Sequence, residues 1–206
     1  MKDRNELVLR GTIISLNVGS KFATVRLAVD GGHGNSNVPS VVFFEPKLLK
    51  GISIRQRVLI HGHTQNRPFS DPRTGKKIIQ TNLVCDKIEP AKRMLLDYFD
   101  SDEIIDAPGG VADDINKVLW VGTVLNVYVP NEKNRLAILR VGNISDNQHR
   151  QCVFSCFERQ SEIANTLNEG DRVAVIGRVT TSSKEKEGQI VYYQNIVCQD
   201  LCIVES

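Results

Sequence analysis

The chain has 206 residues, of which 41% are apolar and 24% are charged, an ordinary balance for a globular protein with a buried core. No stretch approaches the roughly 20 apolar residues of a membrane helix, and the first ten residues lack the apolar run of a signal peptide. The cysteine count is five, an odd number. These features predict a cytoplasmic protein with reduced thiols, no membrane association and no disulfide framework.

Charge is spread unevenly along the chain, although the formal net charge is only +2. Residues 1–89 carry 14 Lys and Arg against 7 Asp and Glu, whereas residues 90–116 carry 2 against 7. Residues 117–206 are balanced, with 10 against 10. The basic first segment therefore predicts an anionic partner.

The predicted elements, taken in chain order, fall into two copies of one pattern. The first strands share a Gly-Thr pair inside alternating apolar residues, and three further segments match in the same order. The matched segments are 7–16 with 118–127, 22–29 with 136–143, 41–46 with 152–159, and 55–63 with 170–178. Each copy then closes with a polar turn and a last strand, at 71–89 and at 186–205. Four matches in one order indicate an internal repeat.

Each copy reads as about five short strands of β-branched residues, with one insert between the third and fourth strands. The second insert is predicted to be a short helix capped by Ser161 and stopped by Gly170, while the first has room for only a turn or two. This is the layout of the OB-fold. The predicted fold class is all-β, with two tandem five-stranded OB-fold barrels at residues 1–89 and 117–206.

Residues 90–116 are predicted to be a linker, because Pro90 opens them and a Pro-Gly-Gly run at 108–110 interrupts them. One helical piece is expected near 92–100. Acidic residues alternate with apolar ones in this segment. It either packs on the barrels or, through residues 97–106, binds replication or recombination proteins that offer a basic apolar groove.

Residues 149–197 contain a His-Arg pair, an aromatic residue four positions after that Arg, a predicted helix with a Glu-x-Ala pattern, a valine-rich strand that begins after a glycine, and a Gly-Gln hairpin that leads to an aromatic residue. In these features the segment resembles the bacterial and phage-type single-stranded DNA-binding protein family. The first copy fits the same outline more loosely. The chain departs from the family at Gln148 and Asn37, where Trp is frequent, and at its last residues, "CIVES", where the family has an acidic tail.

The resemblance implies single-stranded DNA binding without sequence preference, in replication, recombination, repair or the transfer of a mobile element. It implies that Phe154 stacks on a base, that Arg150 contacts the DNA backbone, and that Phe43 is the equivalent of Phe154. Because many members of the family assemble four barrels, it also implies a homodimer with four OB-folds. Such a protein would be associated with the nucleoid.

Binding single strands without reading sequence requires a basic groove that follows phosphates and exposed rings on which any base can stack. In the first copy the candidates are Lys21, Phe22, Arg26, Phe43, Arg67, Phe69, Arg73, Lys76 and Lys77. In the second copy they are Arg135, Arg140, Arg150, Phe154, Arg178, Lys184, Lys186, Tyr192 and Tyr193. Each basic residue can equally belong to a solvated barrel face. Neighbours in a strand point to opposite faces, so one ring of Phe43 and Phe44, and one of Tyr192 and Tyr193, is expected to face outward.

No catalytic motif is present, so no enzymatic activity and no cofactor are predicted. The cysteines form two pairs, Cys152 with Cys156 and Cys198 with Cys202. Both pairs lie on predicted strands, where residues four apart are separated by about 13 Å. Zinc requires sulfur atoms within about 4 Å of one another, so buried thiols and no metal are predicted. Two alternatives remain open: an OB-fold scaffold for a replication or transfer complex, and an RNA-binding protein.

Overall fold

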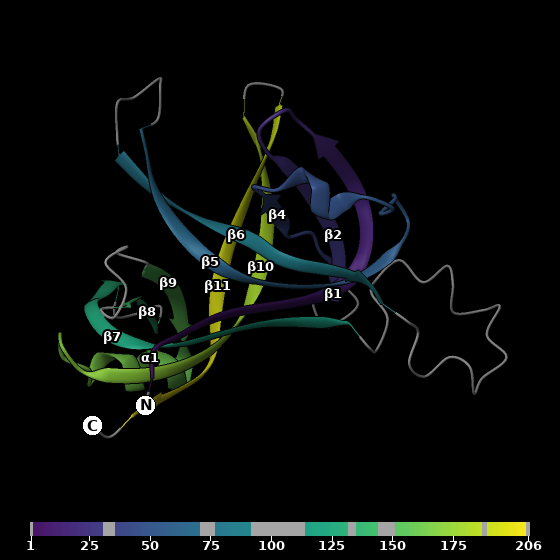
Figure 1. Ribbon diagram of the computed structural model, residues 1–206. Coiled ribbons are helices and arrows are strands. Elements are labelled where there is room, and N and C mark those ends of the chain that lie inside the picture. The colour runs from purple at the N-terminus through teal and green to yellow at the C-terminus, as the bar shows by residue number, and fades with distance from the viewer. Residues whose placement is uncertain are drawn as a thin grey trace, which may run out of the picture.

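The computed structural model describes residues 2–30, 36–70, 77–91, 114–131, 135–143, 151–186 and 189–204. Within these ranges the chain forms one hydrogen-bonded sheet of 11 strands with a single α-helix (Figure 1). No helix in the described ranges has the length and apolar character needed to cross a membrane. The predicted helical piece near 92–100 and the segment 97–106 lie outside the described residues.

The first barrel is closed by five strands. They are β1 (Arg4–Val18), β2 (Ala23–Asp30), β4 (Ser40–Phe43), β5 (Arg57–Ser70) and β6 (Lys77–Pro90). β1 pairs antiparallel with β2 and β5, β2 with β4, and β5 with β6, and a parallel pairing of β4 with β6 completes the circle. A two-residue strand, β3 (Ser36–Asn37), pairs with β2, and a 3-10 turn, η1 (Pro46–Leu49), separates β4 from β5.

The second barrel repeats the same circuit. Its strands are β7 (Ile115–Asn131), β8 (Leu136–Gly142), β9 (Gln151–Phe157), β10 (Arg172–Lys186) and β11 (Gln189–Ile203), again closed by one parallel pairing, between β9 and β11. The predicted all-β fold of two tandem five-stranded barrels is therefore confirmed. Helix α1 (Glu158–Asn165) follows β9 directly, so Ser161 is buried inside the helix. The prediction that Ser161 caps this helix is therefore wrong.

The repeated Gly-Thr pair has a steric cause. Gly11 and Gly122 lie where the first strand of each barrel crosses the second strand at close range. A Cβ atom at either position would collide with a backbone carbonyl oxygen, that of Ala28 in the first barrel and that of Gly142 in the second. Because only glycine permits this approach, the residue recurs in both copies.

The two barrels are joined through their first strands. β1 pairs antiparallel with β7, from Arg4 opposite Val121 to Arg10 opposite Ile115. At the centre of this pairing Leu7 lies opposite Val118. These two residues hold equivalent positions in the two copies, so an approximate twofold axis runs between them.

Two ion pairs repeat this symmetry. Arg57 of β5 contacts Asp114, which precedes β7, with 2.6 Å between Nη2 and Oδ1. In the reciprocal pair, Arg172 of β10 contacts Asp3, which precedes β1. The carboxylate side chains are almost fully buried, with 1% exposure for Asp114 and 6% for Asp3. Each pair ties one barrel to the beginning of the other.

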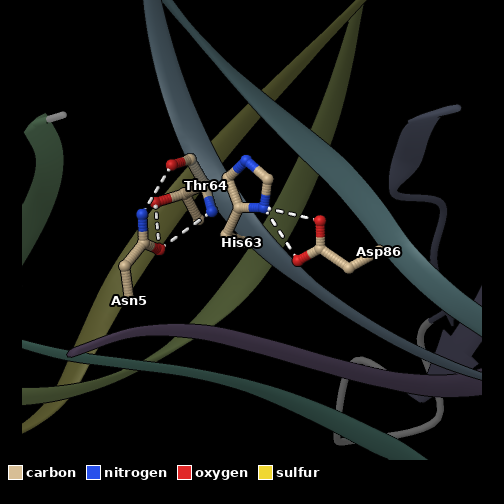
Figure 2. Close-up of polar contacts among 4 residues, drawn as sticks. All are labelled: Asn5, His63, Thr64 and Asp86. Carbon is tan, nitrogen blue, oxygen red and sulfur yellow. Dashed lines mark hydrogen bonds and ion pairs between the residues drawn. The ribbon is translucent and has the colours of Figure 1, made fainter. Parts of the chain in front are cut away.

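Asparagine side chains extend the sheet where the first strands leave their own barrels. The Asn5 amide donates to the carbonyl of Thr64 at 2.8 Å, and its oxygen accepts from the Thr64 backbone N–H at 2.9 Å (Figure 2). Asn116 makes the same two bonds with Val179, both at 2.8 Å. Trp120 is fully buried, and its Nε1 donates to Thr64 Oγ1 at 2.8 Å across the barrel boundary. Buried polar groups of both barrels are thus paired at this junction.

Four of the five cysteines are buried: Cys85, Cys152, Cys156 and Cys198. Burial raises the pKa of the thiols of Cys85 and Cys152 to about 12, so both are neutral at physiological pH. A hydrogen bond with Cys198, together with burial, also raises the pKa of Cys156. Cys202, by contrast, is exposed on β11, so the prediction of buried thiols is wrong at that position.

Thiol reactivity follows from this burial. We expect one thiol, that of Cys202, to react rapidly with Ellman's reagent at pH 8, because the other four are buried and shielded from the reagent. The remaining thiols are expected to react only after unfolding in guanidinium chloride. The control variant Cys202→Ser should abolish the rapid phase, and a rapid phase of two or more thiols would contradict the assigned burial.

Phe154 and Phe157 give a matched test of the barrel interior. Phe154 is fully buried, whereas the Phe157 side chain is 45% exposed at the end of the same strand. We expect Phe154→Ala to lower the free energy of unfolding by about 3–5 kcal/mol, because it leaves a cavity. Phe157→Ala should change it by less than about 1 kcal/mol. Urea unfolding monitored by circular dichroism measures both, and equal effects would show that Phe154 is not a core residue.

Candidate nucleic-acid interface

Strand pairing, not sequence alignment, fixes which residues of the two barrels are equivalent. Phe43 lies opposite Ala23 in the first barrel, and the corresponding pair in the second barrel is Cys156 with Ala137. The equivalent of Phe43 is therefore Cys156. The predicted equivalence of Phe43 and Phe154 is wrong by two residues, one full repeat of the strand.

The predicted stacking role of Phe43 and Phe154 is also wrong. Both side chains have 0% exposure and belong to the apolar core. A ring enclosed within a barrel has no free face for a base, so neither ring can form part of a binding surface in this fold. Their conformation is explained by packing alone.

The rings that do reach solvent lie one residue further along. Phe44 follows Phe43 and is 42% exposed, and Phe157 follows Cys156 and is 45% exposed. They occupy equivalent positions at the end of the third strand of each barrel. The expectation that one ring of Phe43 and Phe44 faces outward is confirmed. Phe157 was missed, although strand parity offered a signal, because Phe157 and Phe154 are three residues apart and must face opposite ways.

Basic side chains accompany these rings at equivalent positions. Arg26 on β2 and Arg140 on β8 are half-buried on the outward faces of the second strands, opposite Ser40 and Val153. Lys21 and Arg135 are exposed in the turns that lead into those strands. The two copies thus carry basic residues and an exposed phenylalanine at the same positions of the barrel.

We call these two surfaces the first face and the second face. The first face consists of Lys21, Phe22, Arg26 and Phe44, and the second face consists of Tyr128, Arg135, Arg140 and Phe157. Phe22 and Tyr128 add exposed rings, with 54% and 62% exposure. Tyr128 stands on β7 opposite Ile138. Both faces lie mainly on the outer side of the second and third barrel strands, which is a ligand-binding side of OB-folds.

The edge of the second face is shaped by two residues with left-handed backbone. Arg135 has a φ of 45° and Glu158 has a φ of 47°, values that non-glycine residues seldom adopt. The Glu158 backbone N–H donates to the Arg135 carbonyl at 3.0 Å. This bond holds the turn before β8 against the end of β9, next to Phe157.

The β10–β11 hairpin crosses from the second barrel onto the first (Figure 1). Thr181 on β10 donates its backbone N–H to Asn37 Oδ1 at 3.1 Å and accepts from the backbone of Val38 at 2.8 Å. Gln194 on β11 accepts from the Ser40 N–H at 3.2 Å and donates to the Thr81 carbonyl at 3.1 Å. Asn37, at a position where the resembled family often has Trp, therefore joins the two barrels.

This hairpin carries further residues predicted from sequence. Tyr192 is 49% exposed and its ring lies under the Arg26 guanidinium, with 4.3 Å between Arg26 Cζ and the ring centroid. Lys184 is exposed on β10, one position beyond Ser183, which lies opposite Tyr192. Tyr193 and Arg178 are half-buried. Tyr192 thus lies beside the first face, although it belongs to the second barrel.

The structure does not describe the side chains of the remaining predicted residues. Arg73, Lys76 and Arg150 lie outside the described residues, and so do the side chains of Arg67, Phe69, Lys77 and Lys186. Among the described residues no three His, Cys, Asp or Glu side chains come together as metal ligands. His63 and Asp86 form only a pair on the outer side of β5 and β6, with 2.8 Å between Nδ1 and Oδ2 (Figure 2).

Comparison with known proteins gives structural matches alone, because no family model and no curated sequence matches the chain. The wild-type single-stranded DNA binding protein from Thermus aquaticus aligns with a TM-score of 0.63 at 14% identity, covering 100% of this chain and 95% of that chain. A deletion mutant of the same protein gives the same score and identity, with 96% of that chain covered. The mitochondrial single-stranded DNA binding protein from S. cerevisiae matches 45% of this chain, with a TM-score of 0.37 and 16% identity.

The full-length alignment to the Thermus aquaticus protein includes both barrels and the connection between them. Its identity of 14% is too low to carry functional residues across, so the alignment bears on the fold alone. The chain therefore has the tandem OB-fold architecture of a solved single-stranded DNA binding protein.

Proposed function

We propose that the protein binds single-stranded DNA without sequence preference and has no enzymatic activity. The observation that carries the proposal is the repetition of one surface. Each barrel exposes a phenylalanine and carries two basic side chains at positions that strand pairing makes equivalent. Core packing does not require these exposed groups, so a shared ligand accounts for their presence in both copies.

The chemistry of the two faces suits a flexible anionic strand. Every base has a π-face, so a ring such as Phe44 or Phe157 can stack on any of them, at about 1–3 kcal/mol per base. Lys21, Arg26 and their equivalents lie where they can neutralise phosphates. Duplex DNA hides its base faces within the stack, which makes it a poor ligand for such rings.

The full-length structural neighbours support this proposal, because both are described as single-stranded DNA binding proteins from Thermus aquaticus. We further propose a role in replication, recombination, repair or the transfer of a mobile element, with the protein acting as a homodimer of four barrels. RNA is the second candidate ligand, since aromatic stacking does not discriminate between sugars.

The test is a fluorescence-anisotropy titration of labelled oligo-dT, with unlabelled duplex DNA and RNA of equal length as competitors. We expect tight binding that duplex DNA does not displace. The logarithm of affinity should fall linearly with the logarithm of salt concentration, with a slope of about −0.7 per phosphate neutralised. Equal displacement by RNA would favour the RNA-binding reading. A lack of binding at low salt would exclude DNA binding and favour the protein-scaffold reading.

The two faces can be tested separately. Phe44→Ala and Phe157→Ala should each weaken oligo-dT binding by about 1–3 kcal/mol, because each removes one stacking ring. Ile203→Ala is the control, since Ile203 is 57% exposed on β11 and belongs to neither face. For charge, Lys21→Ala and Arg135→Ala should each flatten the salt slope, whereas Lys87→Ala on β6 should not. Loss of affinity in the controls equal to that in the face variants would contradict the assignment of the faces.

A further inference from the structure

The contact between Arg26 and Tyr192 joins side chains of two different barrels. The Arg26 guanidinium covers the Tyr192 ring at 4.3 Å from the centroid, in the geometry of a cation–π pair. Tyr192 is nevertheless 49% exposed, so part of the tyrosine side chain remains open to a ligand. A basic group and an open ring therefore lie side by side at the boundary of the first face.

The position of Tyr192 is fixed by the hydrogen bonds that hold its hairpin on the first barrel. Gln194, two residues further along β11, bonds the backbone at Ser40 and Thr81 at 3.2 Å and 3.1 Å. Ser40 in turn lies directly opposite Arg26 in the β2–β4 pairing. Because these bonds hold the hairpin against the strand next to Arg26, a ligand would meet the ring and the guanidinium already side by side, which reduces the entropy lost on binding.

At the register position equivalent to Tyr192, the hairpin of the first barrel carries no aromatic residue. In the β10–β11 hairpin Tyr192 lies opposite Ser183, and the corresponding pair in the β5–β6 hairpin is Ile79 with Pro68. The residue equivalent to Tyr192 is therefore isoleucine, which cannot stack on a base as an aromatic ring does. Arg140, the equivalent of Arg26, has no aromatic residue at the corresponding hairpin position. The approximate twofold symmetry is broken at this point of the interface.

We infer that the first face is a composite nucleotide-binding site that the second barrel completes, and that it is the stronger of the two faces. Tyr192 offers its open side to a base, while Arg26 contacts the adjoining phosphate and holds the opposite side of the ring. The ligand is a segment of single-stranded nucleic acid, so this inference rests on the proposed function.

The test uses the full chain and a labelled oligo-dT of about ten nucleotides, within the range of one OB-fold site. Tyr192→Ala should lower affinity about tenfold, and Tyr192→Leu should lower it equally, because leucine keeps apolar bulk but cannot stack. Tyr192→Phe should stay within about twofold of the unaltered protein. Urea unfolding should give the same midpoint for the Leu and Phe variants, so that a folding defect cannot account for the difference.

A double-mutant cycle tests the pairing across the barrels. The double variant Arg26→Ala/Tyr192→Ala should lose less affinity than the two single-variant losses multiplied together, by a factor of at least about three. The reason is that the two groups act on one nucleotide. The double variant Arg140→Ala/Tyr192→Ala is the matched control. Its loss of affinity should equal the product of the two single-variant losses to within about twofold. Arg140→Ala alone should cost less affinity than Arg26→Ala.

The outcomes separate this inference from the proposed function. If the unaltered protein fails to bind oligo-dT, the proposed function itself is wrong and the inference falls with it. If the unaltered protein binds but Tyr192→Leu keeps full affinity, the composite site is wrong while DNA binding stands. Independent action of Arg26 and Tyr192 in the cycle would overturn the composite site in the same way.

Discussion

The antiparallel pairing of β1 with β7 is the contact on which the arrangement of the two faces depends. The pairing satisfies the backbone groups of both first strands between Arg4 and Arg10 and between Ile115 and Val121, which would otherwise form exposed sheet edges. The cross-barrel ion pairs of Arg57 and Arg172 flank it, and their carboxylate partners are almost fully buried. Breaking such a pair leaves a buried charge without its partner, so the relative position of the barrels is strongly constrained. Two faces on a rigid pair of barrels present their rings and charges at a constant spacing.

The same pairing explains why the hairpins reach across the molecule. Each first strand pairs with the first strand of the other barrel, and its neighbours β5 and β10 extend beyond their own barrels as well. Asn5 and Asn116 maintain the hydrogen bonding at the point of departure. Thr64 then lies close enough to bond Trp120 of the second barrel, and Thr181 close enough to bond Asn37 of the first. The location of Tyr192 beside Arg26 is thus a consequence of strand pairing some distance away.

Much of this fold could be predicted from the sequence, because alternation of β-branched residues and a repeated Gly-Thr pair are local signals. The inward and outward assignment could not be predicted at the third strand of each barrel. The segments "VVFF" and "CVFSCF" carry apolar residues in both parities, so Phe43 and Phe154 were as plausible outside as inside. Their burial is decided by the barrel interior, where Phe154 packs among the residues of the common core. Arg26 and Arg140, in contrast, lie on the outward side of their strands, because an arginine is seldom tolerated inside an apolar barrel. The contact between Arg26 and Tyr192 had no local signal at all, because it depends on how two barrels meet.

A tandem chain can do something that two identical barrels related by symmetry cannot. In a symmetric pair every substitution appears at both sites, whereas here each face can change alone. The equivalent pairs Lys21 with Arg135, Arg26 with Arg140 and Phe44 with Phe157 are what the two faces have kept in common. They differ at the register position that Tyr192 occupies in one hairpin and Ile79 in the other. The two barrels also differ in charge, because residues 1–89 carry 14 basic side chains against 7 acidic ones while residues 117–206 are balanced. Long-range attraction of an anionic strand and the extra ring therefore favour the same face, although the ring comes from the other barrel. A nucleic-acid strand drawn first to the basic barrel would meet side chains of both barrels there. Binding at the first face would therefore depend on the contact between the two barrels.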